Sequence, residues 1–255
     1  MVMPFDFPVA QGRFPRFATT RWSLVLQAKE RPLVGANEAL ADLCRAYWYP
    51  IYALFRRRSR NSHEAQDLTQ SFFAKLLEKA FLDSVDPARG RFRSFLLAAV
   101  NHFFANEWDR KNTLKRGGGQ AILSLDVRAF DWESGESKYQ MEPGHHLTPE
   151  REFERRWALA VLDRVLQRLR DEYIDLGKLS LFETLQPYLS TDREQARYAD
   201  AAEKLNATDS AIRVATHRLR KRYRDLLRNE IAQTVASPSE VEDELQQLFI
   251  ALSSS

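Results

Sequence analysis

Apolar residues recur at helical spacing along most of this chain, and no segment alternates apolar and polar residues as a half-buried strand does. The helical pattern is clearest at residues 37–55, 62–77, 92–111, 148–169 and 208–234. One face of each predicted helix is apolar, and such a face must be buried against another element of the fold. The sequence therefore predicts an all-α fold.

Breaks in this pattern divide the chain into five segments. Pro4, Pro8, Gly12 and Pro15 interrupt any helix near the N-terminus, and Gly117 opens a stretch rich in glycine, serine, aspartate and glutamate. The expected segments are an irregular arm, a first helical domain, a flexible acidic linker, a second helical domain and an amphipathic C-terminal extension, at residues 1–18, 19–116, 117–149, 150–236 and 237–255. A chain of 255 residues is long enough for two small domains with separate cores or for one large helical domain, and the breaks favour two.

Charge and cysteine content limit the functional classes. The net charge of +3 is small, so a nucleic-acid role depends on where the basic residues lie and not on their excess. The N-terminus lacks the pattern of a signal peptide, and no segment has the roughly 18 apolar residues of a membrane span. The single cysteine, Cys44, falls in an apolar helical pattern, which indicates a buried, reduced thiol. These features predict a cytoplasmic protein.

An enzyme is the main alternative from another class, and it requires a chemical constellation. His145 and His146 near Glu142 suggest metal ligands, but adjacent histidines point in different directions and lie in a polar loop. The chain has no phosphate-binding GxxxxGK[ST] motif, no GxSxG elbow and no HExxH motif. We therefore expect no catalytic residues, no metal site and no cofactor.

The segment YADAAEKLNATDSAIRVATHRLRKRY at 198–223 carries the most specific local pattern. Ala202 is small enough for a second helix to approach, and Leu205 and Ile212 can fill the space between two crossing helices. Asn206 stands where the turn requires a residue that tolerates positive φ. Thr208 can cap the second helix. This pattern predicts a helix-turn-helix.

The outward face of that second helix is predicted to bind DNA. Arginine can bond bidentately to guanine in the major groove, and a basic cluster suits the phosphate backbone. The predicted DNA-binding residues are Thr208, Ser210, Arg213, Val214, His217, Arg218, Arg220 and Lys221. The alternative interpretation is an exposed charged helix that closes a bundle.

With these residues in view, the chain resembles sigma factors of the extracytoplasmic-function group over residues 37–116 and 157–231. These proteins join a helical region-2 domain to a helix-turn-helix region-4 domain through a flexible linker. Residues 64–79 resemble the region 2.2 helix, with Asp67, Gln70 and Phe73 at its typical acidic, glutamine and aromatic positions. The resemblance implies that core RNA polymerase is bound by Glu64, Asp67, Gln70, Ser71 and Lys75.

Residues 90–118 resemble regions 2.3 and 2.4, which open the −10 element and hold bases of the displaced strand. The resemblance implies −10 DNA binding by Arg93, Asn101, His102, Asn106, Trp108, Arg110, Lys111, Lys115 and Arg116. The family commonly has asparagine, aspartate and arginine where this chain has His102, Asn106 and Asp109. Individual base contacts are therefore left unassigned. Phe95, Phe103 and Phe104 are expected to pack in the core.

The resemblance implies an RNA polymerase sigma factor that directs promoter recognition and transcription initiation. Region 2 is then expected to recognise the −10 element, and the recognition helix the −35 element. Its implied partners are core RNA polymerase, promoter DNA and an anti-sigma factor or other regulatory protein. The alternative is a helix-turn-helix DNA-binding transcriptional regulator that acts without core polymerase. Purification with core polymerase separates the two.

Three features leave alternatives open. The acidic residues of the linker either mimic RNA in the polymerase channel or belong to a plain tether; they are Asp126, Asp131, Glu133, Glu136 and Glu142. Residues 177–197 are an addition to the family pattern. The C-terminal extension has an apolar face that either packs on the second domain or holds a regulatory partner, formed by Val241, Leu245, Leu248, Phe249 and Leu252.

Overall fold

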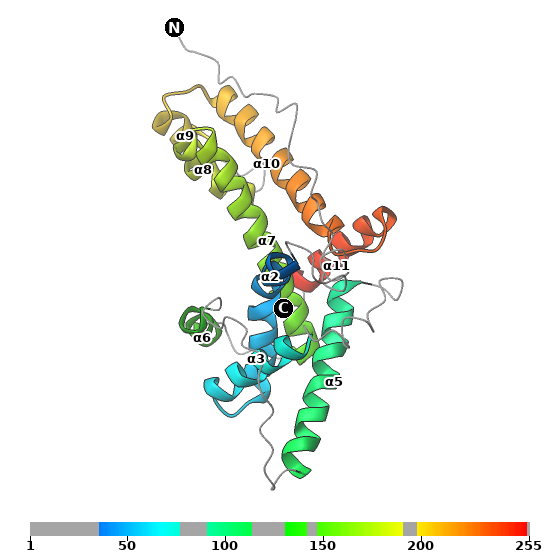
Figure 1. Ribbon diagram of the computed structural model, residues 1–255. Helices are drawn as coiled ribbons and strands as arrows, with labels where there is room; N and C mark the ends of the chain where they lie inside the picture. The colour runs from blue at the N-terminus through cyan, green and yellow to red at the C-terminus, as the bar shows by residue number, and fades with distance from the viewer. Residues whose placement is uncertain (1–35, 77–90, 114–130, 142–146, 191–197, 254–255) are drawn as a thin grey trace. The chain divides into compact units, whose positions relative to one another are not determined.

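The computed structural model describes residues 36–76, 91–113, 131–141, 147–190 and 198–253 (Figure 1). Every element of regular secondary structure within these ranges is a helix, which confirms the predicted all-α class. Contacts divide the chain into two compact units. We call residues 19–161 with 231–255 the α2–α5 unit, and residues 162–230 the α8–α10 unit.

The α2–α5 unit is built around α2 (Ala36–Arg58), α3 (Ser62–Leu76) and α5 (Phe92–Thr113). Phe55, Phe72 and Phe103 contribute one aromatic ring from each helix, and their ring centroids lie 5.6–6.1 Å apart in edge-to-face arrangements. Such aromatic pairs contribute about 1 kcal/mol each beyond the area they bury. The expected core role of Phe103 is confirmed by its burial, and Cys44 is also buried.

A helix, α6 (Trp132–Met141), forms within the segment that the sequence predicts to be a flexible linker. The Trp132 ring lies 5.7 Å from the rings of both Trp48 and Tyr52. Gly135 is buried against Trp48, and a Cβ atom at this position would lie only 2.6 Å from that ring. Absence of a side chain at 135 therefore allows α6 to approach α2 closely.

The carboxylate of Glu136 also holds α6 to α2, through an ion pair and hydrogen bonds. It accepts hydrogen bonds from Arg56 at 3.0–3.2 Å and from the Tyr52 hydroxyl. These contacts are the physical reason for the difference from the prediction. They join residues about eighty positions apart, whereas α6 itself has no apolar stripe that would mark it as a helix.

The C-terminal helix α11 (Val241–Ser253) belongs to the α2–α5 unit and not to the second domain. Leu245 and Leu248 of its predicted apolar face are buried. Phe249, a further member of that face, is 54% exposed. A short 3₁₀ helix, η4 (Pro238–Glu240), precedes α11.

A group of charged side chains around the buried pair Arg93 and Glu244 holds α11 in place. Together with the Trp157 ring we call it the Arg93 cluster: Arg91, Arg93, Glu154, Trp157 and Glu244. Glu244 has no exposed surface and accepts two hydrogen bonds from Arg93, at 2.8 and 3.4 Å, while it pairs with Arg91 at 3.1 Å. Arg93 also pairs with Glu154 at 2.7 Å and lies 5.0 Å from the centroid of the Trp157 ring. The cluster therefore joins the start of α5 to two segments distant in sequence.

Helix α7 (Pro149–Asp175) begins in the α2–α5 unit and ends in the α8–α10 unit. The Thr148 hydroxyl accepts a hydrogen bond from the backbone N–H of Arg151 at 3.3 Å, so Thr148 caps the helix and Pro149 occupies its first position, as predicted. Along the chain, the division between the units falls between residues 161 and 162, whereas the breaks in the sequence predict a domain start at 150. The first turns of α7 belong to the α2–α5 unit because Arg57 pairs with Glu152 there.

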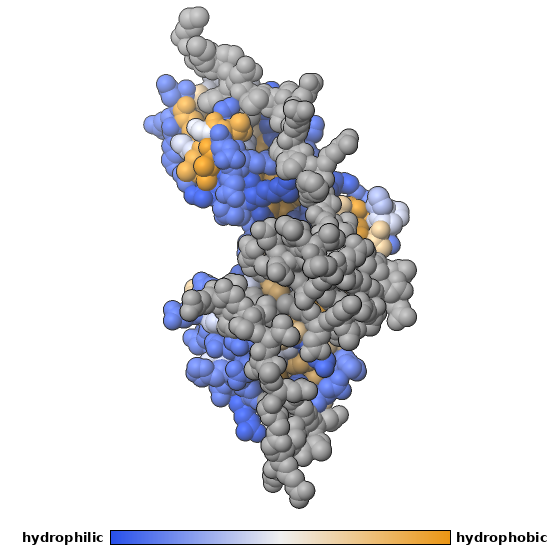
Figure 2. All heavy atoms as spheres, viewed as in Figure 1, coloured by the Kyte–Doolittle hydropathy of each residue, from blue (hydrophilic) through white to orange (hydrophobic). Residues whose placement is uncertain are grey.

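The α8–α10 unit contains the end of α7, α8 (Leu179–Leu185), η3 (Gln186–Leu189), α9 (Ala199–Lys204) and all but the last two residues of α10 (Asp209–Ala232). Arg222 of α10 donates two hydrogen bonds to Glu172 of α7 at 2.6 and 2.8 Å. Figure 2 shows a mostly hydrophilic face on the described residues, with hydrophobic side chains gathered over α8 and α9. Among the helices described, none is both long and apolar enough to cross a bilayer.

Replacing Glu244 with alanine should lower the free energy of unfolding by about 3 kcal/mol, because Arg93 would keep its charge in a buried site with one partner fewer. Chemical denaturation of the full chain measures the change. Asp243→Ala is the matched control, since Asp243 is the exposed neighbour. Equal denaturation midpoints for the two variants would contradict this role of the ion pair.

The contact of α6 with α2 should weaken in acid. Burial by itself raises the pKa of Glu136, but the hydrogen bonds from Arg56 and Tyr52 outweigh it, so the pKa is lowered from 4.5. A lowered carboxyl pKa means that the stabilisation is complete above the ordinary value of 4.5 and is lost as pH falls through the lowered value.

Hydrogen exchange of residues 132–141, corrected for the intrinsic pH dependence and referenced to α5, tests this expectation. Protection should fall in acid for the unaltered chain and for Glu133→Gln, whose side chain is exposed. Glu136→Gln should be less protected at neutral pH and should change less with acid. Identical profiles for all three chains would rule out a role for the Glu136 charge.

Candidate functional site

The polar stripe predicted on α3 lies on its exposed side. Asp67 and Lys75 are exposed, and Gln70 and Ser71 are partly exposed. The opposite side of α3 is buried, through Ala65, Leu68, Thr69, Phe72, Phe73 and Leu76. The apolar side fixes the rotation of the helix, and the stripe is therefore available to a partner.

Glu64, the fifth predicted member of the stripe, has a role within the helix itself. Asn61 accepts a hydrogen bond from the backbone N–H of Glu64 at 2.9 Å, and the Glu64 carboxylate accepts one from the backbone N–H of Arg60 at 2.9 Å. This reciprocal pattern satisfies donors at the start of α3 that the helix cannot pair internally. Glu64 therefore helps to fix the beginning of the stripe.

A shallow, open hollow lies beside this stripe. It is lined mostly by polar residues of α3 and the preceding turn, with Glu107 contributed by α5: Arg60, Asn61, His63, Glu64, Asp67, Leu68, Ser71 and Glu107. Three of the predicted polymerase-binding residues, Glu64, Asp67 and Ser71, thus meet in one concave surface. A hollow with carboxylates on its rim can receive basic side chains of a partner.

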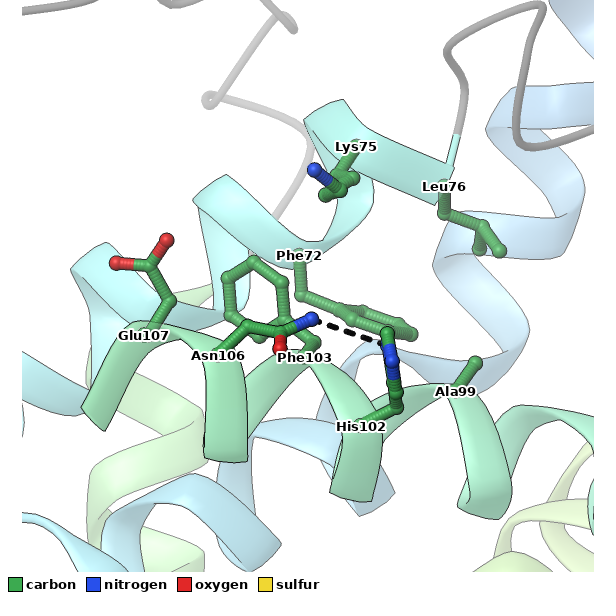
Figure 3. A pocket seen from close by; sticks show the side chains of 8 residues that line it. All are labelled: Phe72, Lys75, Leu76, Ala99, His102, Phe103, Asn106 and Glu107. Carbon is green, nitrogen blue, oxygen red and sulfur yellow. Dashed lines mark hydrogen bonds between the residues drawn. The ribbon is translucent and has the colours of Figure 1, made fainter. Parts of the chain in front are cut away.

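A smaller pocket between α3 and α5 brings the two predicted sets of residues together (Figure 3). Lys75, from the polymerase set, lines it together with His102 and Asn106 from the −10 set. Phe72 and Phe103 line the same pocket, and Asn106 Nδ2 and His102 Nδ1 are hydrogen bonded at 3.1 Å. The exposed amide and imidazole are thus held beside each other on one face of α5.

Arg93 requires a correction, because the sequence predicts it to be a DNA-binding residue. Its side chain is only 6% exposed, and it is paired with Glu154 and Glu244. A guanidinium held by two carboxylates inside the fold does not reach a nucleic acid. The sequence could not reveal this burial, because Glu244 is separated from Arg93 by 151 positions.

The other residues predicted to bind the −10 element fall into three groups. Asn101 accepts a hydrogen bond from Arg58 at 2.9 Å and is half-buried, so it also links α5 to α2. Trp108, Arg110 and Lys111 lie within α5, but the positions of their side chains are not described. Lys115 and Arg116 lie outside the described residues.

The α9–α10 pair reproduces the predicted turn in detail. Asn206 has a φ of 48°, the left-handed conformation expected at this position. The Thr208 hydroxyl accepts a hydrogen bond from the backbone N–H of Ala211 at 3.2 Å, so Thr208 caps α10 as expected. The backbone N–H of Ala207 donates to the carbonyl of Ala202 at 2.9 Å and closes the end of α9.

The two faces of α10 separate as predicted. Ile212, Ala215, Thr216 and Leu219 are buried. The exposed residues of the predicted DNA-binding set are Thr208, Ser210, Arg213, Val214, His217, Arg218 and Lys221. Arg220 differs from these, because it is half-buried and donates two hydrogen bonds to the carbonyl of Tyr188 at 2.6 and 2.9 Å.

Arg213 has contacts that the sequence interpretation missed. Its Nε donates to Asp209 Oδ2 at 2.6 Å, which raises the pKa of the guanidinium. Its Cζ lies 5.2 Å from the centroid of the Tyr198 ring. The four-residue spacing of Asp209 and Arg213 on one helix could have indicated the first contact, whereas nothing local indicated the second.

Within the described ranges, no group of three or more histidine, cysteine, aspartate or glutamate residues is placed so that it could hold a metal ion. Glu142, His145 and His146, the ligands considered from sequence, lie outside those ranges.

Comparison with known families gives one finding. Residues 43–113 match the family model of Sigma-70 region 2. The match includes most of α2 and all of α3 and α5, and therefore Lys75, His102 and Asn106, which line the pocket in Figure 3. It supports a role as an RNA polymerase sigma factor. No curated protein and no solved structure matched the chain.

Removing the cap of α10 should destabilise the α8–α10 unit. Thr208→Ala should cost about 1 kcal/mol in free energy of unfolding, because the N–H of Ala211 loses its side-chain acceptor. Ser210→Ala, two positions along and exposed, is the control and should have a much smaller effect. Urea denaturation followed by circular dichroism measures both. A loss in Ser210→Ala equal to that in Thr208→Ala would contradict the assigned cap.

Proposed function

We propose that this chain is a sigma factor of the extracytoplasmic-function type, which binds core RNA polymerase and directs it to promoter DNA. The match of residues 43–113 to Sigma-70 region 2 carries the proposal. The exposed stripe on α3 supports it, because the matched segment presents polar side chains where a partner can reach them. The chain acts by binding and not by catalysis.

Core polymerase binds α3 through Asp67, Gln70, Ser71 and Lys75. These residues follow i, i+3, i+4 spacing and form a mixed polar surface suited to a charged partner helix. Glu64 contributes by fixing the start of that helix through its hydrogen bond with the backbone of Arg60.

Promoter DNA contacts both units. In the α2–α5 unit, His102 and Asn106 are exposed on α5 and can contact displaced bases of the −10 element, with Trp108, Arg110, Lys111, Lys115 and Arg116 proposed from sequence as further contacts. In the α8–α10 unit, α10 enters the major groove at the −35 element. Its contacts are Ser210, Arg213, Val214, His217, Arg218 and Lys221, while Thr208 caps the helix and Arg220 holds Tyr188.

A second candidate is a helix-turn-helix regulator that binds duplex DNA without core polymerase. The geometry of α9 and α10 favours it, since the capped and exposed recognition helix needs no polymerase to form. The two candidates differ in one property, which is the affinity of the chain for core enzyme.

Reversing the charge of Asp67 tests the proposal. Asp67→Arg should weaken association with core RNA polymerase by about tenfold or more, because it places like charge against a basic partner surface. Asp67 is exposed, so thermal unfolding should be unchanged. Fluorescence anisotropy of the labelled full chain, titrated with core enzyme at low salt, measures the affinity.

Asp243→Arg is the control, because Asp243 is an equally acidic and exposed residue on α11, away from the stripe. It should bind core enzyme like the unaltered chain. An unaltered chain with no affinity for core enzyme would overturn the sigma-factor proposal in favour of the regulator. Equal affinities for all three chains would remove Asp67 from the interface.

A further inference from the structure

Arg213 is exposed on the outward face of α10, yet its position is fixed by two neighbours within the chain. Its side chain is 63% exposed, its Nε is hydrogen bonded to Asp209, and its guanidinium lies over Tyr198. A long exposed side chain ordinarily samples many rotamers. Two independent contacts on one exposed arginine therefore indicate a held orientation.

The hydrogen bond to Asp209 uses the Nε atom of Arg213 and leaves the two terminal nitrogens of the guanidinium available. Asp209 accepts from Nε at 2.6 Å, and within the described residues no acceptor engages the two terminal nitrogens of Arg213. Those nitrogens are one of the donor pairs that can bond bidentately to the O6 and N7 atoms of guanine. Arg213 is thus held through its Nε atom, and its exposed side chain keeps both terminal nitrogens for a partner.

The contact with Tyr198 is supported in turn by Tyr188. Tyr198 is buried, and its ring stacks on that of Tyr188 with centroids 5.2 Å apart and an interplanar angle of 27°. The carbonyl of Tyr188 receives two hydrogen bonds from Arg220 of α10. Arg213 therefore lies on a platform of two stacked rings. This platform is hydrogen bonded to α10, the helix that carries Arg213.

Tyr188 belongs to η3, within the segment 177–197 that the sequence analysis set apart as an addition. Without this segment, Tyr198 would lose its stacking partner and Arg220 its acceptor. The addition therefore has an identifiable structural effect on the outward face of α10.

We infer that Arg213 reads one guanine in the major groove and that Asp209 and Tyr198, backed by Tyr188, are positioning residues for this contact. The inference rests on the proposed DNA binding by α10. Arginine loses less freedom per hydrogen bond when its fork is pre-organised, so the platform favours the complex in which the bidentate bond to guanine forms.

Selection from a randomised duplex library, with the full chain bound to core RNA polymerase, tests the inference. The unaltered complex should select a motif in which one position is guanine. Arg213→Lys should lose that preference by about tenfold, because lysine cannot form the bidentate pair in the same way. The other selected positions should be unchanged.

The positioning role is tested at two residues that differ in burial, Tyr198 and Asp209. Tyr198→Leu should reduce the preference for guanine by about threefold, while Tyr198→Phe should retain it, because phenylalanine keeps the aromatic face. Asp209→Ala, at an exposed position, should reduce the same preference without unfolding the chain. Lys221→Ala is the control, since an exposed phosphate contact should weaken binding to all sequences alike.

Each failure has a distinct meaning. If no motif is selected by the unaltered complex, the proposed function fails. If Arg213→Lys loses the guanine preference while Asp209→Ala and Tyr198→Leu keep it, the positioning inference is overturned and DNA binding by α10 stands. If Tyr198→Leu is misfolded by circular dichroism, Asp209→Ala decides the question, and an unchanged preference there overturns the inference.

Discussion

The buried pairing of Arg93 with Glu244 is the constraint on which the α2–α5 unit depends. Both side chains are almost fully removed from solvent, so each charge requires the other. The pair joins the start of α5 to α11, and Glu154 and Trp157 add the start of α7. The segment that matches Sigma-70 region 2 is therefore held in place by residues that lie forty or more positions after its end.

These contacts determine which side chains α3 and α5 can present to a partner. With α5 fixed at its beginning, Lys75 of α3 and His102 and Asn106 of α5 line one pocket, and the polar stripe of α3 remains exposed. The outward face of α10 belongs to the other compact unit. The chain thus presents two separate sets of polar side chains, as a protein that binds a polymerase and DNA at once requires.

Local features of the fold were predictable because local contacts determine them. The positive φ of Asn206 and the cap by Thr208 follow from the chemistry of a few neighbouring residues. Long-range charge pairs were not predictable. In the sequence, Arg93 cannot be distinguished from an arginine that binds DNA. Only its pairing with Glu244 shows that it is held inside the fold. The same reason applies to α6, which Glu136 holds to α2 within a segment that its composition marks as a linker.

The central claim is that this chain enables core RNA polymerase to start transcription at particular promoters. The most direct test is to map the 5′ ends of transcripts that purified core enzyme makes from genomic DNA of the source organism, with and without the chain. New 5′ ends should appear only with the chain and should share elements at the −10 and −35 positions. Identical 5′ ends in both reactions, under low-salt conditions that favour association, would contradict it.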